Sequence, residues 1–123
     1  MHAVIELVRA KKLRLVSSSV IEFENSFNPF PERKAFVVSI LELASEYGNY
    51  APQMAKRARE LQRENDLTRY DARHIATAEA VGADFFITSD VGLLKKYAGA
   101  LRVVDPLAFF QQYGDYTKNT KSF

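Results

Sequence analysis

Residues 83–90 are the most informative segment for the fold and read Ala83-Asp84-Phe85-Phe86-Ile87-Thr88-Ser89-Asp90. Its centre is a continuous apolar run, which is typical of a strand buried on both faces, as in parallel sheets. Helices are predicted on either side, over 68–81 and 90–97, and a further short strand over 101–104. Strands that alternate with helices in this way predict an α/β protein with a mostly parallel sheet.

Upstream of this stretch the sequence predicts mainly helices. One short strand is expected at Leu13–Val16, and the helices are expected over residues 2–12, 20–27, 32–47 and 52–65. Downstream, residues 106–113 are predicted to form the last helix, followed by a loose polar tail over residues 114–123. We therefore expect a single domain over residues 1–113 and a separate tail.

Composition narrows the function classes. The 123 residues are enough for one domain, and the 47% of hydrophobic residues can fill one core. A formal net charge of +2 permits contact with nucleic acid without demanding it. The sequence has no cysteine, no secretory leader and no apolar run of the roughly 18 residues that crossing a membrane requires. We expect a cytoplasmic protein without disulfides, thiolate metal sites or membrane contact.

Three acidic residues are expected near the carboxyl edge of the predicted sheet, where ligands bind in such folds. Asp90 directly follows the strand at 85–88, Glu24 lies in the helix after the first strand, and Asp71 lies in the first turn of the helix before Phe85. Clustered carboxylates suit Mg²⁺ or Mn²⁺, which prefer oxygen ligands. Such ions activate water and stabilise charge on a phosphodiester.

Each acid also has a purely structural interpretation. Asp71 follows Thr68 at the spacing of a capping box, so it could simply cap its helix. Asp90 could be the N-cap of the helix that begins at Val91. An acid on a helix surface, such as Glu24, is usually only solvated. The sequence leaves both interpretations open for all three residues.

Helical spacing distinguishes Glu24 from its neighbour Glu22. Glu24 falls on the apolar side of its helix and is predicted to turn inward, whereas Glu22 completes a capping box with Ser19. His74 lies one turn after Asp71 among small apolar residues. We interpret His74 as a packing residue rather than a base or a ligand, because no second histidine stands nearby.

Several segments together resemble the PIN domain family. The segments are Asp71-Ala72-Arg73-His74-Ile75-Ala76, Phe86-Ile87-Thr88-Ser89-Asp90 and Val103-Val104-Asp105-Pro106. Residues 18–33 are similar to a VapC-like prokaryotic subfamily. The resemblance implies a Rossmann-like three-layer α/β/α sandwich that cleaves phosphodiesters, usually in RNA, with Mg²⁺ or Mn²⁺. By motif position it makes Glu24, Asp71 and Asp90 the catalytic and metal-binding acids.

The sequence departs from this family at its start. PIN domains begin with a central strand that ends in an aspartate, whereas this sequence begins in the following helix. Without that strand, one metal ligand is missing and two neighbouring strands keep unpaired backbone groups. Three explanations stay open: an upstream start, a different segment or second chain in the gap, or a decayed copy that binds without cutting.

Two functional hypotheses follow. The first is a PIN-type endoribonuclease, toxin-like and restrained by an antitoxin, whose activity is in doubt because one acid is missing. The second is a non-catalytic PIN-fold module, expected to be a homodimer, that binds nucleic acid or protein. A response-regulator-like protein fits less well, because it would need an acidic pair after its first strand. In the nuclease, basic side chains could contact phosphates, although each one taken singly is more often plain solvated surface: Arg33, Lys34, Arg73, Lys95 and Lys96.

Overall fold

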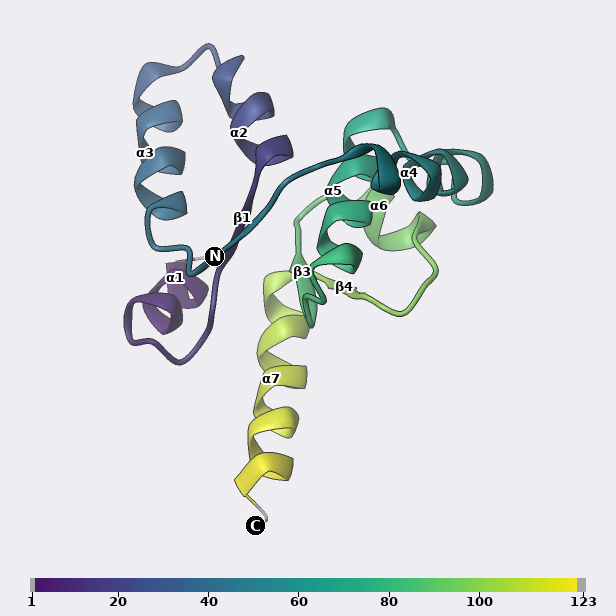
Figure 1. Ribbon diagram of the computed structural model, residues 1–123. Coiled ribbons are helices and arrows are strands. Elements are labelled where there is room, and N and C mark those ends of the chain that lie inside the picture. Colours follow the sequence, from purple (N-terminus) through teal and green to yellow (C-terminus); the bar gives the residue numbers. More distant parts are fainter. Residues whose placement is uncertain (1, 122–123) are drawn as a thin grey trace.

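A computed structural model describes the backbone of residues 2–121 and the side chains of residues 3–113 (Figure 1). Its elements are α1 (His2–Arg9), β1 (Val16–Ser18), α2 (Ser19–Ser26), α3 (Pro31–Leu41), β2 (Glu46–Gly48), α4 (Pro52–Glu64), α5 (Arg69–Ala80), β3 (Phe85–Ile87), α6 (Val91–Lys96), β4 (Arg102–Val104) and α7 (Pro106–Lys121). Helices and short strands alternate along the chain. The predicted α/β class is confirmed.

The strands form two separate parallel pairs. In the first, β1 pairs with β2, and Val16 lies opposite Glu46. In the second, β3 pairs with β4, and Phe85 lies opposite Arg102. Among the described residues the two pairs share no strand, so each strand has one hydrogen-bonded neighbour. The predicted parallel pairing is therefore confirmed, but it is divided between two small sheets.

The prediction of one helix over residues 32–47 is wrong in its second half. The helix α3 ends at Leu41, and Glu46–Gly48 form β2, which the sequence analysis did not predict. The backbone N–H of Ser45 donates to the carbonyl of Leu15 at 3.1 Å, which leads this segment alongside β1. Tertiary strand pairing has here overridden a local helical pattern.

Several other boundaries differ from the prediction, among them the end of the first helix, which is Arg9 and not residue 12. The strand expected at Leu13–Val16 lies at Val16–Ser18, so it starts where the prediction ended. The last helix was expected to end at Tyr113, but α7 continues to Lys121 and projects from the rest of the molecule in Figure 1. The tail is therefore helical over 114–121, and residues 122 and 123 lie outside the described part. The division at residue 113 into domain and tail stays a prediction.

Apolar side chains are buried in two clusters. The smaller cluster joins Val4 of α1 to Val104 and Phe109, and the ring of Phe109 meets that of Phe85 edge-on at 5.0 Å. The larger cluster is built mainly by α4 and α5 and consists of Ala58, Leu61, Leu67, Ala72, Ile75, Ala76, Leu93 and Leu101. By contrast, α3 contains no buried residue, and its Phe36 side chain is 58% exposed.

A polar clamp fastens α4 and α5 to the segment after α6. The Arg57 guanidinium donates two hydrogen bonds to the Glu79 carboxylate, at 2.7 and 3.0 Å, and the Tyr97 hydroxyl donates a third at 2.7 Å. Burial raises the pKa of Glu79, but the hydrogen bonds from Arg57 and Tyr97 outweigh burial and leave that pKa below its ordinary value. The charged form of Glu79 is therefore the one that the fold stabilises.

The helix α5 lies against both strand pairs. At β2, a Cβ atom added to Gly48 would stand 2.7 Å from Cγ2 of Thr77 and 3.0 Å from Cγ1 of Val81, so glycine permits this close approach. At β3, the His74 ring lies 6.3 Å from the Phe86 ring, measured between centroids. Contacts with both strand pairs therefore fix the position of α5.

Candidate functional site

The first candidate residues lie on α2, whose start differs from the prediction. Ser18 is the N-cap, and its hydroxyl accepts a hydrogen bond from the Ile21 N–H at 3.1 Å. The expected capping box of Ser19 and Glu22 is therefore wrong. Ser19 instead accepts a hydrogen bond from the Tyr50 N–H, and Glu22 accepts one from the Tyr47 hydroxyl. Glu22 is thus directed towards β2.

Glu24 is oriented differently from the inward position predicted for it. Its side chain is 55% exposed, so the prediction of an inward carboxylate is wrong. Its Oε2 atom lies 3.1 Å from Nε2 of His74, whose side chain is only 12% exposed. Because a carboxylate only accepts hydrogen bonds, the proton of this bond belongs to Nε2 of His74. The pair connects α2 with α5.

The packing role predicted for His74 is confirmed, but it is not the whole role. The ring lies against Phe86, as a packing residue would, and it also binds the Glu24 carboxylate. Sequence reasoning missed this second contact. The two residues are separated by 50 positions, so no local spacing could have revealed it.

Asp71 has an unused carboxylate. The hydroxyl of Thr68 accepts a hydrogen bond from the Asp71 N–H at 3.2 Å, which confirms Thr68 as the N-cap of α5. Within the described part of the chain, no hydrogen bond or ion pair involves the Asp71 side chain, which is half-buried. A half-buried carboxylate without a partner is the kind of group that a cation would stabilise.

The Asp90 side chain, by contrast, has a structural role at the start of α6. Its Oδ1 atom accepts a hydrogen bond from the Leu93 N–H at 3.2 Å, which makes Asp90 the N-cap of α6. Its own N–H donates to the Thr88 hydroxyl at 3.1 Å, which closes the turn after β3. The capping interpretation of Asp90 is therefore confirmed, and any ligand role would come in addition to it.

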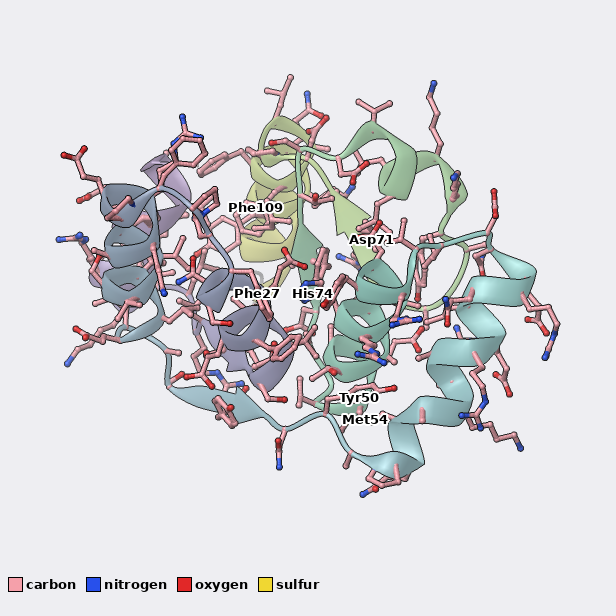
Figure 2. All side chains as sticks on the ribbon, turned by 90° about the horizontal axis from the view of Figure 1, so that it is seen from above. Phe27, Tyr50, Met54, Asp71, His74 and Phe109 are labelled. Atoms are coloured by element: carbon pink, nitrogen blue, oxygen red, sulfur yellow. The ribbon has the colours of Figure 1, made fainter. Side chains whose placement is uncertain are left out.

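The three predicted acids fit a divalent ion in chemistry but not in arrangement. Carboxylate oxygens are the ligands that Mg²⁺ and Mn²⁺ prefer. Among the residues that the structure describes, however, no three acidic, histidine or cysteine side chains gather closely enough to share one ion. Glu24 and Asp71 belong to the junction of α2 and α5, where His74 lies between Phe27 and Asp71 in Figure 2, whereas Asp90 begins α6.

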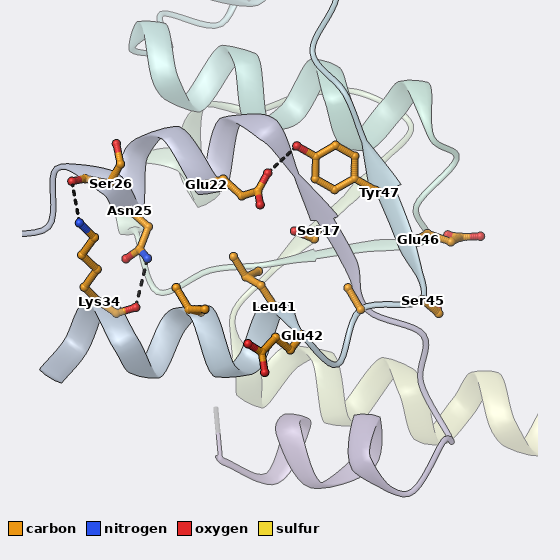
Figure 3. A pocket seen from close by; sticks show the side chains of 12 residues that line it. Ser17, Glu22, Asn25, Ser26, Lys34, Leu41, Glu42, Ser45, Glu46 and Tyr47 are labelled. Atoms are coloured by element: carbon orange, nitrogen blue, oxygen red, sulfur yellow. Dashed lines mark hydrogen bonds between the residues drawn. The ribbon is translucent and has the colours of Figure 1, made fainter. Parts of the chain in front are cut away.

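A pocket of about 540 Å³ lies elsewhere, between α2, α3 and the first strand pair (Figure 3). Glu22 and Tyr47 face each other at its rim, and the Lys34 ammonium donates to the Ser26 carbonyl at 3.2 Å. None of the predicted metal-binding acids lines this pocket. The pocket is therefore not the region in which the sequence predicts a metal ion.

Comparison with known proteins identifies the family. The family model of the PIN domain matches residues 2–100, which is most of the chain. No curated protein and no solved structure matches. Within the described residues, no helix has the length and apolar character needed to span a bilayer. PIN domains have a Rossmann-like α/β fold, a nuclease-type function and, in general, divalent metal ions. The alternating helices, the parallel strands and the match together show that this chain belongs to the PIN domain family.

Proposed function

We propose that this PIN domain is a metal-dependent endoribonuclease of the toxin kind, with Glu24, Asp71 and Asp90 as the residues that hold Mg²⁺ or Mn²⁺. The observation that carries the proposal is the 3.1 Å contact of Glu24 with His74. Asp71 and His74 are one helical turn apart on α5, so their side chains lie on the same side of this helix. The contact with His74 therefore supports a position of Glu24 on the side where Asp71 lies. When bound, the ion supplies an activated water and charge neutralisation for the phosphodiester.

The surroundings of the two nearer acids support this assignment. The Asp71 carboxylate has no partner among the described residues, and a cation would relieve the cost of its partial burial. The Nε2–H of His74 holds the Glu24 carboxylate in one orientation, as hydrogen bonds behind metal ligands commonly do. These groups would therefore bind and orient, while Asp90 would also cap α6.

We further propose RNA as the substrate, an antitoxin as the regulatory partner, a homodimer as the assembly and the cytoplasm as the location. Unpaired apolar surface on α3 supports association with a second chain, since Phe36 and Val38 are 58% and 46% exposed.

A non-catalytic PIN-fold module is the second candidate. Two observations favour it: Asp90 is occupied as a helix cap, and no three acids of the described residues share a metal site. Such a module would keep the fold and bind nucleic acid or protein without cleaving it. Binding of a divalent metal separates the two candidates.

The first experiment is calorimetric titration of the protein with Mn²⁺. Asp71→Asn and Asp90→Asn each remove one carboxylate charge, and asparagine keeps the oxygen that caps α6 at position 90. Asp84→Asn is the matched control, because Asp84 is an exposed acid next to β3 outside the proposed set. We expect both site variants to weaken Mn²⁺ binding at least tenfold, with the control unchanged.

RNA cleavage assays with Mn²⁺ and with EDTA complete the test. Metal-dependent cleavage that both site variants lose would support the nuclease. Wild-type protein that binds no Mn²⁺, or site variants that bind as the control does, would overturn the assignment in favour of the non-catalytic module.

A further inference from the structure

Three solvent-exposed aromatic rings lie close together where α2 contacts α5. Phe23 and Phe27 of α2 are 51% and 68% exposed, and Tyr70 of α5 is 37% exposed. The Phe23 ring lies 5.0 Å from the Phe27 ring at 76° and 6.3 Å from the Tyr70 ring at 32°, measured between centroids. The rings form one continuous surface, which we call the aromatic surface.

The aromatic surface adjoins the predicted metal-binding acids. Phe23 directly precedes Glu24, and Tyr70 directly precedes Asp71. His74, the residue that binds the Glu24 carboxylate, follows Tyr70 by four residues on α5 and so lies one turn away on the same side. A ligand lying across these rings would therefore extend to the two acids.

Within the described part of the chain, no other residues cover these three rings and bury them. Fully burying one such side chain would contribute about 1.5–3 kcal/mol, yet the fold leaves all three exposed. Contiguous exposed apolar surface is a common feature of binding sites. The T-shaped contact of Phe23 with Phe27 leaves ring faces open for stacking.

Two cationic side chains near the rings indicate which ligand they fit. Arg69 is exposed and directly precedes Tyr70. Arg33 lies over the Phe30 ring at 4.5 Å, at the start of α3, where the Lys34 ammonium donates to the carbonyl of Ser26, the residue before Phe27. Within the described residues neither arginine belongs to an ion pair, so both guanidinium groups can bind anions. Open aromatic faces combined with free cations are characteristic of sites for single-stranded nucleic acid. An apolar protein surface would leave these cations without partners.

We propose that the aromatic surface stacks the bases of unpaired nucleotides while Arg33 and Arg69 contact their phosphates, a proposal that rests on the nuclease function above. Bases in a duplex are stacked on one another and cannot reach the rings, whereas bases in loops and single strands can. The site would select unpaired segments and lead the adjoining backbone to Glu24 and Asp71.

The test measures binding without metal, so that it does not depend on catalysis. The probe is a fluorescein-labelled, single-stranded oligodeoxyadenylate, titrated with protein in EDTA at fixed salt and followed by anisotropy. We expect Phe27→Ala to weaken binding about 5- to 100-fold, the loss that removing one stacking ring causes. Phe27→Tyr keeps a ring and should bind as the wild type does.

Leu107→Ala is the control. Leu107 is also an exposed apolar residue, at 71%, but it lies on α7, outside the aromatic surface and outside the α3 surface proposed for association. We expect it to bind the probe within about twofold of the wild type, and we expect duplex of the same sequence to bind all proteins more weakly. Circular dichroism and melting curves verify that each variant is folded.

Three outcomes would overturn the proposal: undiminished binding by Phe27→Ala, an equal loss in Leu107→Ala, or equal affinity for duplex. A fourth is a smaller assembly of Phe27→Ala in light scattering, which would assign the surface to a second copy of the chain. Stacking that depends on Phe27 in a protein without Mn²⁺-dependent cleavage would refute the nuclease but not the aromatic surface.

Discussion

Replacing Glu79 by glutamine tests how the helical half of the protein is held together. The substitution keeps the shape of the side chain but removes the charge that accepts two hydrogen bonds from Arg57 and one from Tyr97. A hydrogen bond to a charged group contributes about 1.5–3 kcal/mol when it is buried. The Arg57 and Glu79 side chains are 34% and 20% exposed, so solvent screening reduces that value. We expect a total loss of about 2–3 kcal/mol.

Thermal unfolding followed by circular dichroism measures this loss. For a domain of this size, 1 kcal/mol corresponds to roughly 4 °C, so Glu79→Gln should melt roughly 8–12 °C below the wild type. Glu60→Gln is the matched control, because Glu60 contacts the same guanidinium at 3.6 Å with similar exposure. We expect the control to lose less than about 0.5 kcal/mol. Equal losses in the two variants would refute the reasoning, since the clamp would then be an ordinary surface ion pair.

Four further predictions follow from single contacts. Folding lowers the pKa of Glu79 below its ordinary value of 4.5. The stability that the Glu79 carboxylate contributes is therefore present above pH 4.5 and is lost as the pH falls through the folded pKa. The difference in melting temperature between wild type and Glu79→Gln should accordingly shrink in acid. Gly48→Ala should cost about 1–3 kcal/mol in urea unfolding, since its Cβ would meet α5; a neutral result would contradict the close approach. A double-mutant cycle of Glu24→Gln and His74→Asn should give a coupling of about 0.5–1 kcal/mol, and additive losses would exclude the hydrogen bond. Thr68→Ala should lower stability by about 1 kcal/mol in the same urea assay, the usual cost of an N-cap, and an unchanged midpoint would contradict the cap.

The parts of the fold that local pattern controls were predictable. The apolar run of β3 and the cap at Thr68 depend on neighbouring residues, and the structure contains both. The strand β2 was not predictable, because Glu46-Tyr47-Gly48 carries no apolar pattern and gains its conformation from pairing with β1. The division of the strands into two pairs likewise depends on contacts that no single segment encodes.

The candidate site was predictable only where a residue acts on its own helix. Asp90 caps α6 through Leu93, three residues away, as its position suggested. The orientation of Glu24 was not predictable, because the amphipathic pattern of α2 implied that Phe23 and Phe27 face the core, whereas both are exposed. In such a short helix the apolar side can serve a ligand instead of the core.

The division of the strands has a consequence for how the chain could be cut. Both strands of the first pair precede residue 49, and both strands of the second pair follow residue 84. Every side chain of the larger apolar cluster lies between Ala58 and Leu101. A break in the connection at residues 49–51 would therefore sever no strand pairing, and we expect the two fragments to reassociate when mixed. The contacts of Gly48 with Thr77, of Glu24 with His74 and of Val4 with Val104 and Phe109 would join them, which is the arrangement that a split reporter requires.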